Sequence, residues 1–390
     1  MTRRRAIRSG VVLVAVAVLV AAYFVWWRSS PPAEQLRIGR AALAAGDTAT
    51  AARIAESLSA KHPDHARILK ADIQLQQGDP QNALFHLNKI EDKGELRREA
   101  ASLAGQCMLA LQNLPEAERA FQFVLSEQPD NIDGHRGLAA VYFDQGALQK
   151  CLDHLAEVAK LDPMDARPHR MMGYIHADLE AHAEAVENYR AALGRSLSAT
   201  AASEVREELA QQLVKLGQPA AALETLGPPA GTESPRATAT RAEAEWAQGR
   251  TAEAVARLDA ALKSHADSLP LLRLRGKLHV EAGEWEPAAV LLERAVKADT
   301  TDLTSLHHLA MAYDRLKRPA DAERVRKQHQ STKDALGTLT TLNREADARP
   351  WDPAVRLKLA EVCESLGKSQ LAVMWRRAAE AGAVRSGNVP

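Results

Sequence analysis

Three residues whose types could do chemistry stand close together in the stretch YFDQGALQKCLDHLAEVAKLDP, residues 142–163. Cys151, Asp153 and His154 supply a thiol, a carboxylate and an imidazole within four residues. Such a set could bind a metal ion or activate the thiol as a nucleophile. Zinc usually needs four ligands, however, and no second Cys/His pair lies at metal-binding spacing. The three widely spaced cysteines of the chain also exclude a disulfide framework.

Other motifs that could carry catalysis are equally incomplete. SLGKS at 365–369 resembles the end of a phosphate-binding loop, but Val362 stands where that motif needs its first glycine. The sequence contains no G-x-S-x-G, no HExxH and no glycine-rich loop after a strand. We therefore expect no catalytic residue, no metal site and no cofactor. A metal-binding protein or enzyme built on Cys151 and His154 is kept as an alternative.

The elements that would position Cys151 recur along the chain. A turn, a small residue and a hydrophobic helix appear in GDTATAARIAESLSAKHP, LPEAERAFQFVLSEQP and GALQKCLDHLAEVAKLDP. The small residues follow one another at spacings of 32, 34, 34, 34, 37, 32, 34, 34 and 50: Ala51, Ala83, Ala117, Cys151, Ala185, Ala222, Ala254, Ala288, Ala322 and Ala372. A buried thiol behaves as a small hydrophobe. The pattern thus predicts that Cys151 packs where the other units have alanine.

Each unit is predicted to form two helices. In the third unit, small and apolar residues at 104–108 and again at 117–124 recur at i, i+3, i+4 and i+7. Pro129 and Pro163 are expected to end the second helices of their units. A single helix pair cannot bury its apolar face, so neighbouring pairs must stack.

This pattern resembles the tetratricopeptide repeat family, whose 34-residue unit places Leu-Gly, Tyr, Ala, an aromatic residue, Ala and Pro at fixed positions. The matches include Gly39, Ala51, Pro63, Gly105, Ala117, Phe121, Pro129, Leu138, Tyr142, Pro163, Gly173, Ala185, Tyr189, Ala192, Leu309, Ala310, Tyr313 and Ala322. The resemblance covers about 33–382 and implies an all-α, right-handed superhelical solenoid of about ten helix pairs.

The repeats divide the chain into segments. Repeats one to six are expected at 33–226, repeats seven to nine at 237–330, and a final repeat at 351–382. The Pro/Gly/Ser-rich residues 227–236 should form a loop or mild hinge. The extra residues 331–350 should form a helix extension plus a loop, and 383–390 a mobile tail.

The N-terminus predicts a membrane anchor. The basic residues 1–10 precede 11–27, which carries no charge and ends with aromatic residues. Seventeen residues of helix reach roughly 25 Å, at the short end of the transmembrane range. The positive-inside rule puts the N-terminus in the cytoplasm and the repeats, after a linker at 28–33, on the extracytoplasmic side. This would be the periplasmic side of a bacterial inner membrane. Cleavage of a signal peptide near Ala22, followed by export, is the alternative.

The resemblance also implies that the first helices of the pairs line a concave groove. Alignment by the small residues gives these candidates for partner binding: Arg136, Phe143, Asp144, Arg167, Arg170, Met171, Tyr174, Asp178, Trp246, Arg273 and Lys277, with Met311 further along. Arginine and aromatic residues commonly anchor interfaces. Family members that hold peptide C-termini use a Lys/Asn clamp, but Gln106, Ala140 and Tyr174 occupy the Asn position here. An extended or helical protein segment is the expected ligand.

The expected function is that of a non-catalytic scaffold, tethered to the membrane through 11–27, which binds other proteins or peptide segments. The 50 basic and 50 acidic residues balance, which argues against nucleic acid as a partner. Nothing indicates a small-molecule substrate. An alternative is an envelope-biogenesis factor for polysaccharide, lipopolysaccharide or cytochrome maturation. One such lipopolysaccharide regulator has a C-terminal metal domain with paired cysteines, which Cys363 alone cannot provide.

Overall fold

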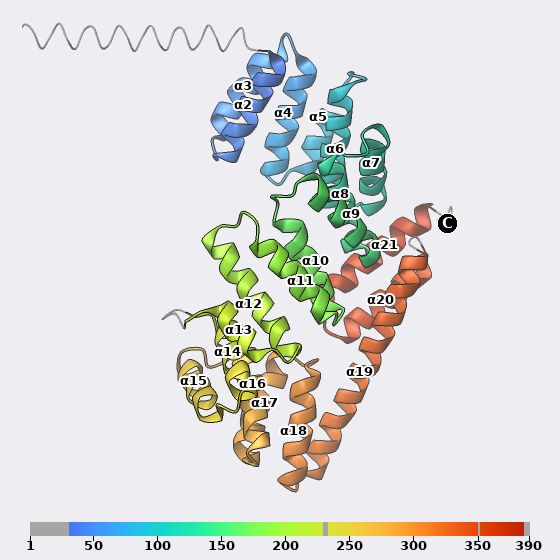
Figure 1. Cartoon of the computed structure of the whole chain (residues 1–390). Coiled ribbons are helices and arrows are strands. Elements are labelled where there is room, and N and C mark those ends of the chain that lie inside the picture. Colours follow the sequence, from blue (N-terminus) through green and yellow to red (C-terminus); the bar gives the residue numbers. More distant parts are fainter. Residues whose placement is uncertain (1–30, 229–232, 350–351, 386–390) are drawn as a thin grey trace, which may run out of the picture. The chain divides into compact units, whose positions relative to one another are not determined.

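The computed structural model describes residues 31–228, 233–349 and 352–385, and within them every regular element is a helix. In this described part of the chain, twenty helices form ten consecutive pairs (Figure 1). The first helices of the pairs are α2 (Pro32–Ala44), α4 (Pro63–Gln76), α6 (Glu95–Ala110), α8 (Ile132–Asp144), α10 (Arg167–Asp178), α12 (Ala199–Lys215), α14 (Pro235–Ala247), α16 (Leu269–Glu281), α18 (Leu303–Arg315) and α20 (Pro353–Ser365). The second helices are α3 (Thr48–Ser59), α5 (Pro80–Leu87), α7 (Leu114–Glu127), α9 (Leu148–Leu161), α11 (His182–Leu193), α13 (Pro219–Leu226), α15 (Thr251–Ser264), α17 (Trp285–Ala298), α19 (Pro319–Ala348) and α21 (Ser369–Arg385).

Short polar and glycine turns set where the helices begin and end. Asp47 caps α3 because its side chain accepts a hydrogen bond from the Thr50 backbone N–H. Gly146 joins α8 to α9 with φ of 72°, a conformation that glycine adopts without strain. As predicted, α7 and α9 end before Pro129 and Pro163. The prolines stop helices because they lack the N–H that would continue the backbone hydrogen bonding.

The ten small residues that defined the repeat are all buried. Cys151 and Ala372 are 1% exposed, and the eight other alanines are completely covered. A larger side chain at these positions would force the two helices of a pair apart. The predicted packing role of Cys151 is therefore confirmed.

Neighbouring pairs stack, as predicted: the second helix of one pair packs on the first helix of the next, as α3 does on α4, and consecutive first helices also touch. Helix α4 contacts both α2 and α6, and α16 contacts both α14 and α18. In the third pair, the fully buried ring of Phe121 lies against Gly105 of α6 and Gly137 of α8. Glycine at these positions lets the aromatic ring approach the helix backbone.

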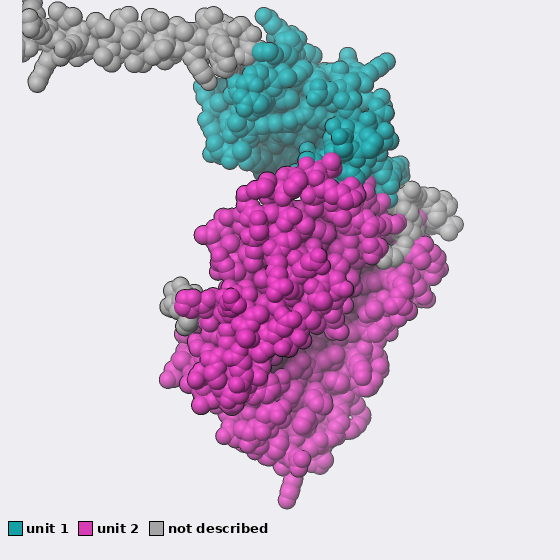
Figure 2. Space-filling view, in the orientation of Figure 1, with its two compact units in different colours: residues 1–137 teal, residues 138–390 magenta. Residues whose placement is uncertain are grey.

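The chain divides into two compact units, residues 1–137 and 138–390 (Figure 2). The division falls within α8. Of the segment 227–236, residues 229–232 lie outside the described residues, and α14 already begins at Pro235. Within the second unit, α19 continues unbroken for 30 residues, so that most of 331–350 extends the second helix of its pair.

The C-terminal pair returns to the beginning of the second unit. Trp375 of α21 is 4% exposed and lies against Gly146 in the turn between α8 and α9. A methyl group added at Gly146 would stand 2.9 Å from the Trp375 ring. The long α19 leads the chain toward this contact between α21 and the turn that precedes α9 (Figure 1).

The predicted anchor at 11–27 and the residues preceding it lie outside the described residues, as do 386–390 of the predicted tail. Among the helices of the described part, none combines the length and apolar character needed to span a membrane.

Candidate functional site

The Cys151 cluster does not converge on a common point. The Cys151 thiol is buried, and burial raises its pKa to about 12. The exposed Asp153 accepts a hydrogen bond from Gln149, whereas the His154 ring stacks on Tyr142 with 5.5 Å between ring centroids. Within the described residues, no three His, Cys, Asp or Glu side chains are placed to hold a metal ion. The three side chains therefore make separate contacts and do not form one site.

Two aromatic residues of the predicted groove do come together. Phe143 of α8 and Tyr174 of α10 lie with ring centroids 6.4 Å apart, a tilted pair between successive first helices. Tyr174 is 52% exposed and Met171, one helical turn earlier, is 38% exposed. Exposed aromatic and methionine side chains on neighbouring elements are typical of binding surfaces. We call Phe143, Met171 and Tyr174 the aromatic patch.

Asp144 and Asp178 are the acidic candidates beside this patch. Asp144 follows Phe143 at the end of α8, and desolvation raises the pKa of its carboxyl group. Asp178 is exposed at the end of α10.

The predicted groove arginines of α10 are bound within the protein. Arg170 pairs with Glu208 and Glu204 of α12, at nitrogen–oxygen distances of 2.7 and 2.9 Å. Arg167 pairs with Asp165 at 2.8 Å. Hydrogen bonding to Glu208 raises the pKa of Arg170 further above its ordinary value. Arg170 thus joins two neighbouring repeats, a role that the sequence alone did not suggest.

The other predicted cations and the tryptophan also make internal contacts. Lys277 of α16 places its ammonium group 4.6 Å from the centre of the Trp246 ring on α14, at cation–π distance. Arg273 pairs with Asp302 at 2.7 Å. Arg136 pairs with Asp133 at 3.4 Å, but it belongs to the first unit, unlike the rest of the candidates. Of the predicted set, the aromatic patch is therefore the part that combines mutual contact with exposure.

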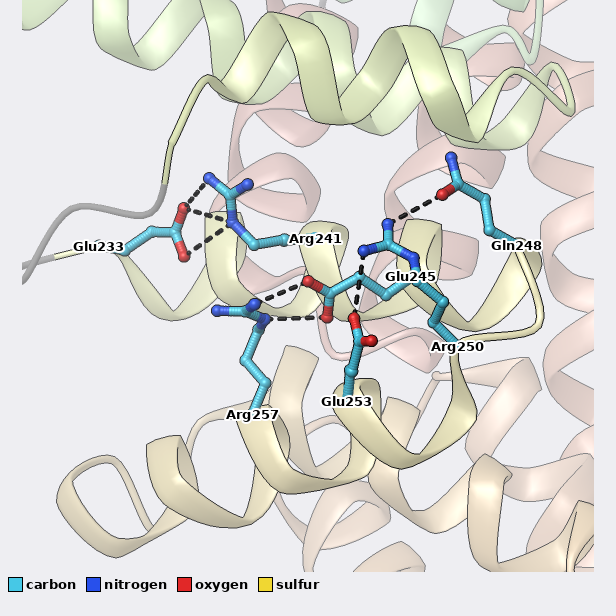
Figure 3. Close-up of polar contacts among 7 residues, drawn as sticks. All are labelled: Glu233, Arg241, Glu245, Gln248, Arg250, Glu253 and Arg257. Atoms are coloured by element: carbon cyan, nitrogen blue, oxygen red, sulfur yellow. Dashed lines mark hydrogen bonds and ion pairs between the residues drawn. The ribbon is translucent and has the colours of Figure 1, made fainter.

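The seventh repeat contains charges that are buried instead of presented to a partner. Arg241 of α14 is 4% exposed and bonds Glu233 at 2.6 Å (Figure 3). Glu245, also 4% exposed, receives two hydrogen bonds from Arg257 of α15. A buried charge is tolerated only when it is paired in this way. These groups hold α14, α15 and the preceding loop together.

Sequence reasoning missed a second polar site, which lies in the first unit. Arg40 of α2 bonds Asp72 of α4 at 2.8 Å and also contacts Glu99 of α6. These residues line a cavity of about 420 Å³. The sequence did contain an indication of this site. Arg40, Asp72 and Tyr174 all lie 11 residues before the small residue of their repeat. The same alignment that identified Tyr174 would have found them.

Comparisons with known proteins identify the repeat type. Models of the tetratricopeptide repeat match residues 36–95, 108–173 and 245–310. The comparison with curated proteins finds no significant match.

Several solved structures are similar to this chain. A tetratricopeptide repeat protein from Parabacteroides merdae is 18% identical, with 64% of this chain and 98% of that chain covered and a TM-score of 0.43. The human IFIT1 dimer with PPP-AAAA is 16% identical, covers 90% and 89%, and has a TM-score of 0.40. YrrB, a TPR protein with an unusual peptide-binding site, is 15% identical, covers 56% and 94%, and has a TM-score of 0.30. Similarity at this level concerns the fold, and no ligand is transferred from it.

Proposed function

Because this chain contains tetratricopeptide repeats, which generally mediate protein–protein interactions, we propose that it is a non-catalytic scaffold that binds a segment of a partner protein. The aromatic patch is the observation that carries this proposal. Phe143 and Tyr174 are in mutual contact on successive first helices, and half of Tyr174 is exposed. Aromatic side chains supply large contact area at interfaces, with little loss of side-chain entropy.

The surroundings of the patch favour a polypeptide ligand. Arg170 of α10 is already paired with Glu204 and Glu208 of α12, so a partner meets an apolar centre beside charges that are largely bound within the protein. That arrangement is typical of protein interfaces. It also explains why an Arg170→Glu variant would be a poor test, since a third carboxylate beside Glu204 and Glu208 would repel both.

A site-specific crosslinker tests the patch directly. We expect p-benzoylphenylalanine at position 174 to form a discrete protein adduct in living cells, because a bound segment would cover this side chain. The adduct should be lost when Phe143→Ser is added. The matched control carries the crosslinker at Met164, which is 62% exposed but lies outside the patch. Equal adducts at both positions, or an adduct that survives Phe143→Ser, would contradict the assignment.

We also propose that the scaffold is tethered to the membrane through residues 11–27, with the repeats on the extracytoplasmic side. The support is the uncharged run itself and the four arginines that precede it. The full chain should stay in the membrane pellet after alkaline carbonate extraction, and intact-mass measurement should show the original N-terminus. A soluble chain that begins near Tyr23 would instead support signal-peptide cleavage.

A further inference from the structure

The first unit contains a cavity that the aromatic patch does not involve. Its volume, about 420 Å³, lies within the range of ligand sites, roughly 300–1,000 Å³. Residues of the first helices α2, α4, α6 and α8 line it, together with Gln128 and Asn131. The residues of the cavity thus belong mainly to first helices, as the residues of the aromatic patch do in their own unit.

Negatively charged side chains outnumber positively charged ones in the lining of the cavity. Its four carboxylates and two guanidinium groups are those of Asp72, Glu95, Glu99 and Asp133, and of Arg40 and Arg98. Arg40 is already bound by Asp72 and Glu99. The lining as a whole carries two more negative than positive charges. Burial raises the pKa of the Asp72 carboxyl although Arg40 acts in the opposite direction, so one guanidinium does not fully compensate this group.

A hydroxyl group in the lining provides an independent indication of a ligand. Ser102 of α6 is 9% exposed and lines the cavity. The structure shows no hydrogen bond from its hydroxyl group to any of the described residues. The oxygen of this hydroxyl group is not among the fully buried, unpartnered polar atoms of the described residues, so it is accessible from the cavity. A donor entering the cavity would supply the missing partner.

We propose that this cavity binds the cationic side chain of a lysine or arginine carried by an extended segment of a partner protein. The proposal rests on the proposed scaffold function for the nature of the partner, but it concerns a separate site. Carboxylate oxygens and the Ser102 hydroxyl are acceptors, and an ammonium or guanidinium group offers three to five donors to such a set. Charge-assisted hydrogen bonds of this kind are about twice as strong as neutral ones.

Other ligand classes fit the cavity less well. An anion would find one guanidinium, that of Arg98, not already bound to a carboxylate of the lining, and would be repelled by the excess negative charge. A metal ion needs converging ligands, and no suitable group of three occurs in the described part of the chain. A positively charged side chain satisfies both the charge and the hydrogen-bonding requirement.

Fluorescence anisotropy with defined peptides tests the proposal on the full-length protein in detergent. The probe is a labelled peptide of repeated Gly-Ser-Lys triplets, compared with peptides in which norleucine or glutamate replaces lysine. We expect binding of the lysine peptide, weakened by salt, and no binding of the other two. Norleucine keeps the apolar stem without the charge, so its failure would identify the ammonium group as the recognised feature.

Charge variants locate the binding. Glu95→Gln with Asp133→Asn removes the net charge of the lining, keeps the partners of Arg40 and releases Arg136 from Asp133. It should weaken binding about tenfold or more. Ser102→Ala should weaken binding severalfold, whereas Arg98→Gln should strengthen it by removing a like charge. The matched control is Glu127→Gln, an exposed carboxylate of α7 outside the cavity, which should bind as the unmodified protein does.

The outcomes separate this proposal from the scaffold function. Phe143→Ser should leave the lysine peptide bound, even though it abolishes partner crosslinking through p-benzoylphenylalanine at position 174. Unchanged binding by the Glu95→Gln/Asp133→Asn variant would overturn the proposal, as would equal binding of the norleucine or glutamate peptide. Binding of free spermidine without any binding of the lysine peptide would also overturn it, because the ligand would then not be a protein segment.

Discussion

At the scale of the residue, Cys151 shows how position in a repeat overrides chemical type. Its thiol fills the space that alanine fills in the other nine repeats, and it is 1% exposed. Because the thiolate is the reactive form, a thiol with a raised pKa inside an apolar contact is a poor nucleophile and a poor ligand. Burial raises the pKa of Cys107 to about 11 and also raises that of Cys363. All three cysteines therefore act as small packing residues.

Thiol labelling checks this interpretation. At pH 8 the native protein should react with iodoacetamide at none of its three cysteines on the timescale of minutes, because both exposure and thiolate formation are suppressed. The same reagent should label all three in guanidinium chloride. Rapid labelling of Cys151 in the native state would show that its environment is open or electropositive, and would revive the alternative of a reactive site.

At the scale of the element, glycines decide how closely a second helix approaches the first helices beside it. Gly105 of α6 faces the Phe121 ring so closely that an added methyl group would stand 2.7 Å from it. Gly337 of α19 is also helical, but a methyl group added there would have no other atom within 4 Å. The same substitution at the two sites therefore separates helix propensity from packing.

Gly105→Ala and Gly337→Ala should shift stability in opposite directions. At Gly337, alanine should stabilise the protein by up to about 1 kcal/mol, since it restricts the unfolded chain and favours the helix. At Gly105, overpacking of about 1–3 kcal/mol should exceed that gain. Denaturant midpoints measure both, and Phe121→Leu should partly restore the Gly105→Ala variant. Stabilisation by Gly105→Ala would show that the ring can move aside at little cost.

At the scale of the whole molecule, the second unit contains a contact between repeats far apart in the sequence. Trp375 of the tenth pair packs on Gly146 of the fourth. Solenoid repeats ordinarily contact only their neighbours. Here the 30-residue α19 and the final pair add a long-range contact, and Gln145 beside it is 2% exposed.

Replacing Trp375 tests whether this contact holds the fourth pair. Trp375→Ala should destabilise the C-terminal pair by about 3–5 kcal/mol, the usual loss for a buried tryptophan. It should also speed amide hydrogen exchange at Ala147, whose N–H bonds the Tyr142 carbonyl in the same turn. Trp285→Ala, on α17, is the control and should leave exchange at Ala147 unchanged. If Trp375→Ala also left it unchanged, the contact would contribute nothing to the stability of the turn.

The sequence by itself determined what depends on neighbours along the chain. The period of 34, the buried small residues and the turns follow from local spacing, and the helix pairs had to stack because one pair cannot bury its apolar face. Only the tertiary structure showed that Arg170 is paired with α12, that Arg40 and Asp72 line a cavity, and that Trp375 returns to Gly146. These contacts depend on how side chains of different repeats are oriented and on rotations accumulated over several repeats. A hydrophobic pattern indicates which face of a helix is buried, but it does not indicate which residue of a distant repeat packs against that face.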